Sequence, residues 1–413
     1  MKKPGEIAVE ELSGGLRLVY SHRSGALAGI LGVAVRAGSA DDGEGREGLA
    51  HFVEHTIFKG TERRSSWHII NRMETVGGEL NAYTTKEETV VYTVFPSGEA
   101  ARGAELVADL IVNSRFPEKE LAKEREVVAD EIDSYLDTPS EAVFDDFEDM
   151  MFSGTPVGHN ILGSRASLEG FTPEICREYL KRNYVRRNMV VFYCGSRSLS
   201  AIRKLVEQHF SMVPEGCVNE GKAGMPLLAA PRFNTIRIID SHQAHTVLGT
   251  RVEGIYGEER FAVALLANML GGPGMNSLLN VELRERRGLV YSVEASTAMF
   301  AGGGALCIYY GCDPDDSALC RKLCNQVFAD VRDGKISPRK LEAAKKQYMG
   351  QLLIAGENSE TRILGAARAT LFHGRPSSLE ETAEAIRKVS AEDLAKLAGR
   401  LADECSVLTL GPY

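Results

Sequence analysis

The stretch ELNAYTTKEETVVYTVF, residues 79–95, contains two runs in which polar and apolar side chains alternate. The first run is ELNAYTT, the second is ETVVYTVF, and both are rich in the β-branched and aromatic residues that favour strands. A few polar residues between them fit a tight connection. The stretch therefore predicts two neighbouring antiparallel strands, and with them a fold of the α+β class rather than a parallel α/β sheet.

The first half of the chain is expected to build a domain around this pair. A composition of three prolines and three glycines without periodicity marks residues 213–231 as an interdomain linker. Upstream of it we expect strands at 5–10, 16–21, 27–37 and 188–195, and helices around residues 51–60, at 65–76, 98–114, 118–137, 140–151 and 173–183, and after Ser198.

The second half repeats this order of elements. Strands are expected at 234–239, 244–252, 290–298, 304–311 and 405–410, with a helix from residue 257 and several more after the fourth strand. The chain therefore resembles a diverged tandem duplication: domain 1–212, linker 213–231 and domain 232–413. Each domain is expected to be an α/β unit with a mostly antiparallel sheet and helices packed on one side.

Composition and charge narrow the function. A chain of 413 residues with 44% hydrophobic and 25% charged residues is typical of a globular protein with more than one core. The net charge of −9 disfavours nucleic acid as the main partner. No apolar run is long enough to span a bilayer, so no membrane association is expected. The eight scattered cysteines lack the pattern of a disulfide scaffold, and we expect a cytoplasmic protein.

The segment HFVEHTIFKG, residues 51–60, contains an HxxEH pattern. On a helix, His51, Glu54 and His55 share one face, and apolar residues fill the opposite one. The apolar side consists of Leu49, Phe52, Val53 and Ile57. Two imidazoles four positions apart are a possible pair of metal ligands, but for such a pair taken alone a solvated helix face is the better explanation.

A third ligand is offered by ELAKEREVVADEIDSYLD, residues 120–137. The expected buried stripe of this helix is Leu121, Val128, Ile132 and Tyr135. Glu124 and Glu131 fall on the edge of that stripe, where an unpaired carboxylate is costly to desolvate. A bound cation removes the cost; salt bridges to Arg125 or Lys123 are the alternative.

Together these residues resemble the pitrilysin/insulinase metallopeptidases, which carry an inverted zincin motif. The glutamate 76 positions past the second histidine of HxxEH is Glu131, and a second glutamate, Glu124, lies seven positions before Glu131. The supporting segments are HFVEHTIFKGT, GGELNAYTTKEETVVY, EREVVADEI, YVRRNMVVFYCG and LRERRGLVYSV. The resemblance covers essentially the whole chain. In length, the chain is most similar to the branch that contains the mitochondrial processing peptidase β subunit and its bacterial relatives.

The resemblance implies a role for each residue of the first half's site. His51, His55 and Glu131 are expected to bind one Zn²⁺ per chain. Glu54 is expected to be the general base, and Glu124 a second acid that orients a ligand.

It also implies two further groups outside HxxEH. Arg284 and Tyr291, at a helix end and the start of the next strand, are expected to hold the substrate carbonyl and stabilise the oxyanion. Asn81 and Ala82 are expected on an edge strand to which an extended peptide adds. Without the resemblance, all four would be ordinary surface or strand residues.

The expected activity is zinc-dependent hydrolysis of peptide bonds in unstructured peptides enclosed in a clamshell chamber. Because both halves of the site share one chain, a homodimer is expected, or a heterodimer with a paralogue. The alternative from another class is a noncatalytic assembly subunit of the same fold, as in the core proteins of respiratory complexes. Those proteins usually lose motif residues that this chain retains.

Overall fold

The computed structural model describes residues 7–216, 226–227 and 231–412. These residues form two compact units that are not the two sequential halves. One unit contains residues 1–133, 160–221 and 355–377, and the other contains 134–159, 222–354 and 378–413. The predicted linker at 213–231 falls partly outside the described residues. Each half of the sequence thus contributes one segment to the opposite unit.

The first unit is built on a six-stranded sheet in the order β1-β2-β6-β3-β5-β4. All neighbouring strands are antiparallel except β2 and β6. The expected pair at 79–95 is β4 and β5, and β4 lies at one edge of the sheet. The strands are β1 Ile7–Glu11, β2 Arg17–His22, β3 Ala28–Val35, β4 Glu79–Thr84, β5 Thr89–Pro96 and β6 Met189–Gly195.

The second unit has a five-stranded sheet in the order β7-β11-β8-β10-β9. Apart from β1, this is the order of the first sheet, because in both the last strand lies between the first two and runs parallel to the first. The two sheets therefore have the matching topology expected of a duplication. The strands are β7 Asn234–Ile238, β8 Ala244–Val252, β9 Val290–Phe300, β10 Gly303–Cys312 and β11 Ser406–Gly411.

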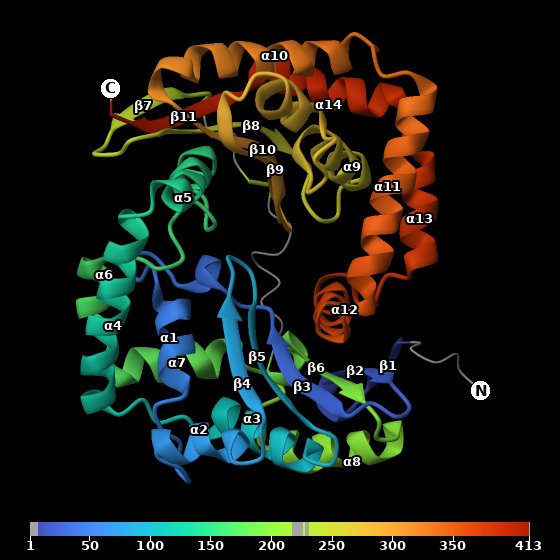
Figure 1. Cartoon of the computed structure of the whole chain (residues 1–413). Coiled ribbons are helices and arrows are strands. Elements are labelled where there is room, and N and C mark those ends of the chain that lie inside the picture. The colour runs from blue at the N-terminus through green and yellow to red at the C-terminus, as the bar shows by residue number, and fades with distance from the viewer. Residues whose placement is uncertain (1–6, 217–225, 228–230, 413) are drawn as a thin grey trace. The chain divides into compact units, whose positions relative to one another are not determined.

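Helices cover both faces of each sheet. In the first unit α3 and α8 pack on one face, while α12 packs against β2, β3 and β6 on the other (Figure 1). The helices drawn mainly from this unit are α1 Leu49–Ile57, α2 Ser66–Glu74, α3 Ala100–Asn113, α4 Glu118–Leu136, α6 Arg165–Glu169, α7 Pro173–Asn183, α8 Leu199–His209 and α12 Ser359–His373.

The second unit follows the same scheme. Helix α5 packs against β8 and β11 of its sheet. Helices α9 and α14 also contact this sheet. The helices drawn mainly from this unit are α5 Pro139–Met151, α9 Arg260–Gly271, α10 Ser317–Arg332, α11 Pro338–Glu357, α13 Leu379–Lys388 and α14 Ala391–Glu404, with the π-helical segment η5 at Asn280–Glu285.

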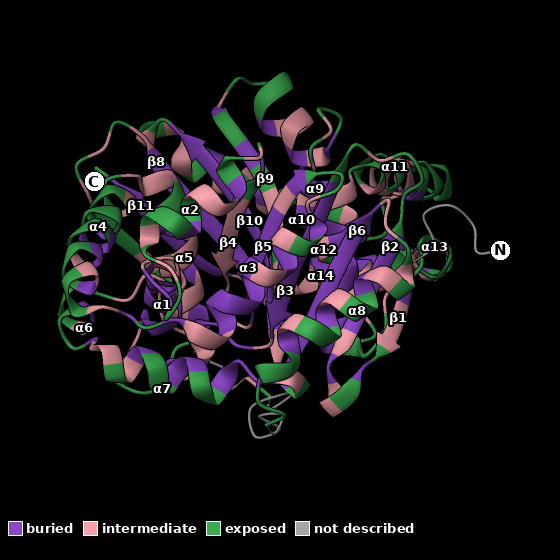
Figure 2. Ribbon diagram, turned by 90° about the horizontal axis from the view of Figure 1, so that it is seen from below, coloured by how far each residue is buried: buried purple, intermediate pink, exposed green. Residues whose placement is uncertain are grey.

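The α+β class and the tandem units expected from the sequence are confirmed, and the structure adds one helix to the second face of each sheet. The reason is visible in the central strands. Along β3 and β6 almost every residue is buried, and Figure 2 shows both strands in purple. A strand buried on both faces requires cover on both. Among the described residues, no helix combines the length and apolar character needed to cross a bilayer.

Candidate metal centre

Helix α1 presents the HxxEH residues because its other side is committed to the core. Leu49, Phe52, Val53 and Ile57 are at most 1% exposed, as the sequence predicted. His51 is also buried, whereas Glu54 and His55 are half-buried. The amphipathic pattern thus places the two imidazoles and the glutamate on the one face of α1 that is free for chemistry.

The start of α1 is fixed by a buried carboxylate. Asp42 accepts hydrogen bonds from the backbone N–H groups of Gly48 and Ala50, both at 2.7 Å. Gly48 has a positive φ of 96°, and a Cβ there would lie 2.6 Å from the carbonyl oxygen of Leu162. Glycine is therefore required at this helix start. Together these contacts set the rotation of α1 from its first turn.

His51, His55 and Glu131 form a three-donor cluster. One donor atom of each lies within 4.8 Å of the other two. The Glu131 Oε2 atom is 3.8 Å from Nε2 of His51 and 3.5 Å from Nε2 of His55. These separations exceed an ordinary hydrogen bond of about 2.9 Å. They are close to the roughly 3.3 Å edge of a tetrahedron with zinc–ligand bonds of about 2.0 Å.

The protonation state of His51 also suits a metal. Burial, reinforced by the neighbouring His55, lowers the pKa of His51 to about 3. The imidazole is then neutral at physiological pH and has a lone pair to offer. Two neutral nitrogen donors and a carboxylate are the donor set of catalytic zinc sites that leave a fourth position open. The residues therefore fit the ion that the sequence predicted.

Glu124 is placed beside this cluster rather than in it. Its Oε2 atom lies 3.5 Å from Nδ1 of His55, the nitrogen turned away from Glu131. Its Oε1 atom forms an ion pair with Nζ of Lys59 at 2.7 Å. In this geometry Glu124 can accept a hydrogen bond from Nδ1–H of His55, which leaves Nε2 free for a metal.

Two details of the expected α4 helix need correction. Glu124 is buried as predicted, but the Glu131 side chain is 44% exposed, so desolvation alone does not single it out. The alternative salt bridges to Lys123 and Arg125 are absent from the described structure. Lys123 instead pairs with Glu120, and Arg125 with Glu118. Lys123 is exposed, whereas Arg125 is half-buried and also donates a 2.6 Å hydrogen bond to the carbonyl oxygen of Phe171.

Lys59 was not identified from the sequence. It lies two residues beyond the end of α1 and four positions after His55, a spacing that keeps it on the His55 side of the helix. Burial of Glu124 requires a counter-charge, and Lys59 supplies it. In the sequence, the available signal for Lys59 is its position four residues after the second histidine. This position indicates an ion pair only when Glu124 is known to lie nearby.

Glu54 belongs to the same face but has a different partner. Its Oε2 atom accepts a 2.6 Å hydrogen bond from the hydroxyl of Thr84 at the end of β4. Burial raises the pKa of Glu54 above its ordinary value, and the hydrogen bond from Thr84 opposes this rise. Glu54 is not one of the three clustered donors. It is thus available as a proton acceptor next to the metal ligands.

The remaining predicted residues lie on two other elements. Asn81 and Ala82 are on the edge strand β4, which pairs only with β5 among the described residues. Arg284 is on η5 and Tyr291 is the second residue of β9, both in the second unit. Both side chains are exposed, Tyr291 to 64%. Their secondary-structure positions, a helix end and a strand start, are those expected.

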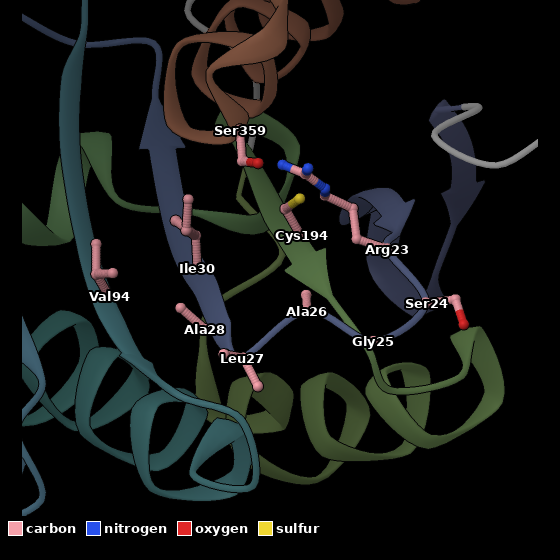
Figure 3. Close-up of a pocket in the computed structure, with 10 residues that line it drawn as sticks. All are labelled: Arg23, Ser24, Gly25, Ala26, Leu27, Ala28, Ile30, Val94, Cys194 and Ser359. Atoms are coloured by element: carbon pink, nitrogen blue, oxygen red, sulfur yellow. The ribbon is translucent and has the colours of Figure 1, made fainter.

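A cavity of about 370 Å³ in the first unit contains none of these residues. It is formed by the connection between β2 and β3, the ends of β5 and β6, and the start of α12 (Figure 3). Its lining includes Arg23, Leu27, Cys194 and Ser359, without a cluster of acid, base or metal-binding groups. Among the described residues, the group of histidines and acids placed to hold a metal ion is His51, His55 and Glu131, on α1 and α4.

Comparisons with known proteins identify the family of the chain. The family described as "Insulinase (Peptidase family M16)" matches residues 17–165, and "Peptidase M16 inactive domain" matches 170–348. A protein of Mycobacterium leprae named an uncharacterized zinc protease is 33% identical over 408 residues, covering 97% of this chain and 91% of that protein. A Mycobacterium tuberculosis protein of the same designation is 34% identical over 406 residues, covering 97% and 92%.

The fold matches as well. A crystal structure from Pseudomonas fluorescens described as a peptidase M16 inactive domain has a TM-score of 0.90 at 20% identity, covering 99% of this chain and 98% of that one. The chain belongs to the M16, or insulinase, peptidase family. The pitrilysin/insulinase resemblance seen in the sequence is thereby confirmed.

The first prediction concerns the third ligand. Glu131→Gln removes the only carboxylate of the cluster and should reduce zinc affinity by more than the roughly 10–100-fold typical of changes outside the ligand set. Zinc content after dialysis, measured by mass spectrometry, tests this. Asp130→Asn, an exposed neighbour on the same helix, is the matched control and should retain full zinc. Equal zinc content in both variants would contradict the assignment.

The second prediction concerns Lys59. Lys59→Met leaves the buried Glu124 without its counter-charge and should weaken zinc binding about 10-fold, because the His55 Nδ1 acceptor is disturbed. A competition titration against a chromogenic chelator measures the affinity. Lys123→Met removes an exposed lysine paired with Glu120 and should have no effect. An unchanged affinity in Lys59→Met would show that the ion pair does not support the site.

Proposed function

We propose that this chain is a zinc-dependent endopeptidase that hydrolyses peptide bonds in unstructured peptides or short polypeptides. The observation that carries the proposal is the His51, His55 and Glu131 cluster with Glu54 beside it on the same helix face. Family membership supports the peptidase class. The named relatives support zinc, and we propose one ion per chain, held by the three clustered donors.

The chemistry divides between metal and protein. A zinc ion held by His51, His55 and Glu131 would supply a bound water of lowered pKa and a Lewis acid for the scissile carbonyl. Glu54 accepts the proton of the attacking water and passes it to the leaving amine. This role requires a carboxylate that is not bound to the metal, and Glu54 is not one of the three clustered donors. Glu124 and Lys59 hold His55 in the tautomer that binds metal.

The substrate is proposed to bind along β4. This strand is at the edge of the first sheet, and its free side offers main-chain donors and acceptors to an extended peptide. Asn81 and Ala82 are near the middle of β4 and would contact the peptide beside the cleaved bond. Recognition through the main chain favours unstructured substrates, because a folded segment has already paired those groups.

Arg284 and Tyr291 are proposed to complete the site by binding the substrate carbonyl and stabilising the oxyanion. Their exposure supports a role in contacts with another molecule. We propose that they act on the zinc half of a second copy of the chain, within a homodimer that closes as a clamshell, although a processing-peptidase-like pairing with a paralogue would use the same groups. The described cysteines are all free thiols, which supports a cytoplasmic location.

The third prediction tests the general base and the activity together. Incubating the pure protein with a peptide library, with and without chelator, should yield cleavage that the chelator abolishes. Glu54→Gln should retain zinc and fold but lose about 10²–10⁴-fold in turnover, since it removes general base catalysis. Chelator-independent cleavage, or no cleavage by zinc-loaded protein, would instead indicate a noncatalytic subunit or another chemistry.

The fourth prediction tests the shared site. Mixing inactive Glu54→Gln with inactive Tyr291→Phe, under conditions of subunit exchange, should rebuild one intact site per mixed dimer and restore part of the activity. Arg284→Ala should behave like Tyr291→Phe, because both groups are assigned to the same carbonyl. The matched control mixes Glu54→Gln with His51→Ala, which both damage the zinc half and should yield nothing. Failure of the first mixture despite proven exchange would rule the shared site out.

A further inference from the structure

The hydrogen bond between Thr84 and Glu54 connects two elements that are far apart in sequence. Thr84 is the last residue of β4, and its Oγ1 atom lies 2.6 Å from Oε2 of Glu54 on α1. No other hydrogen bond to the Glu54 side chain occurs within the described parts of the chain. The motif HxxEH does not imply this partner, which depends entirely on how β4 and α1 pack together.

The direction of this hydrogen bond follows from the proton count of the neighbouring hydroxyls. Thr89, which pairs with Thr84 across β4 and β5, donates its single hydroxyl proton to the carbonyl oxygen of Ala37 at 2.8 Å. The Thr89 hydroxyl, 3.5 Å from Oγ1 of Thr84, therefore has no proton left to donate there. The carboxylate of Glu54 can only accept, and at 2.6 Å it lies closer to Oγ1 of Thr84 than the Thr89 oxygen does at 3.5 Å, so Thr84 donates its proton to Glu54.

The strand explains why Thr84 faces the helix. Side chains alternate along a strand, so Leu80, Ala82 and Thr84 share one face of β4. Leu80 and Ala82 pack against the hydrophobic core that includes the buried side of α1. Packing of these two residues thus fixes the hydroxyl of Thr84 at the height of Glu54. The other carboxylate oxygen of Glu54 remains free of the threonine.

We propose that Thr84 is a positioning residue for the general base: its hydroxyl holds one oxygen of Glu54 so that the other is directed to the attacking water. The inference rests on the proposed role of Glu54. It adds a coupling between substrate binding and catalysis, because the strand proposed to receive the peptide also carries the hydroxyl that orients the base. A shift of β4 on binding would be transmitted directly to Glu54.

Three variants test the proposal. Thr84→Val keeps the shape but lacks the hydroxyl, and should lower kcat by about 10–100-fold, part of the 10²–10⁴-fold due to the base, with KM and zinc content little changed. Thr84→Ser restores the hydroxyl and should recover most of kcat. If Thr84→Val does not fold, Thr84→Ala takes its place, since it lacks the hydroxyl without filling its space.

Thr93→Val is the matched control. Thr93 lies on β5, and its hydroxyl donates a 2.6 Å hydrogen bond to the carbonyl of Glu79 at the other end of the same strand pair. Its loss should reduce stability without affecting kcat. Wild-type kcat in Thr84→Val, equal losses in the serine and valine variants, or an effect on KM alone would overturn the proposal.

A double variant separates this inference from the proposed function. If Thr84 acts through Glu54, Thr84→Val combined with Glu54→Gln should be no less active than Glu54→Gln alone, because residues that act as a unit are non-additive. Full activity of Glu54→Gln would refute the role of the base itself. An inactive Glu54→Gln together with a fully active Thr84→Val would refute only the positioning role.

Discussion

The site depends on the packing of one short helix. α1 has nine residues, too few to be stable on its own, and it is held by the burial of Leu49, Phe52, Val53 and Ile57 and by the carboxylate of Asp42 at its first turn. Once that face is buried, the positions of His51, Glu54 and His55 are determined. The rotation of α1 about its axis therefore decides which side chains can bind the metal and which can act as the base.

Electrostatics then distinguishes the roles of similar side chains. Three glutamates lie near α1, and their surroundings separate them. Glu131 is exposed and directed at both imidazoles; Glu124 is buried and neutralised by Lys59; Glu54 is held by a neutral hydroxyl. A carboxylate already paired with a lysine is a poor metal ligand, whereas one with a single neutral partner can accept a proton. The division of labour is thus built into the contacts.

The sequence predicted the parts of the structure that local periodicity controls. The helix with HxxEH, the pair β4 and β5, the duplicated order of strands and the buried position of Glu124 all follow from patterns within 20 residues. The exchange of α5 and α12 between units could not be predicted, since an amphipathic helix does not specify which sheet it covers. The unbroken apolar run of β6 was the available hint that both sheet faces are covered.

The contacts at the site were less predictable, for the same reason. Lys59 and Thr84 are ordinary residues in the sequence, and each acquires its role from a neighbour more than 25 positions away. The edge of the apolar stripe made Glu131 a candidate, but only the family pattern assigned it as the third ligand, because its side chain is 44% exposed and gives no burial signal. Tertiary placement, rather than residue type, decides such roles.

The coordination of the bound metal tests the central claim most directly. X-ray absorption at the zinc K-edge of the loaded protein should show only nitrogen and oxygen neighbours at about 2.0–2.1 Å, with the outer-shell scattering of two imidazoles. Sulfur neighbours at about 2.3 Å, or the signature of fewer than two imidazoles, would contradict a site made by His51, His55 and Glu131.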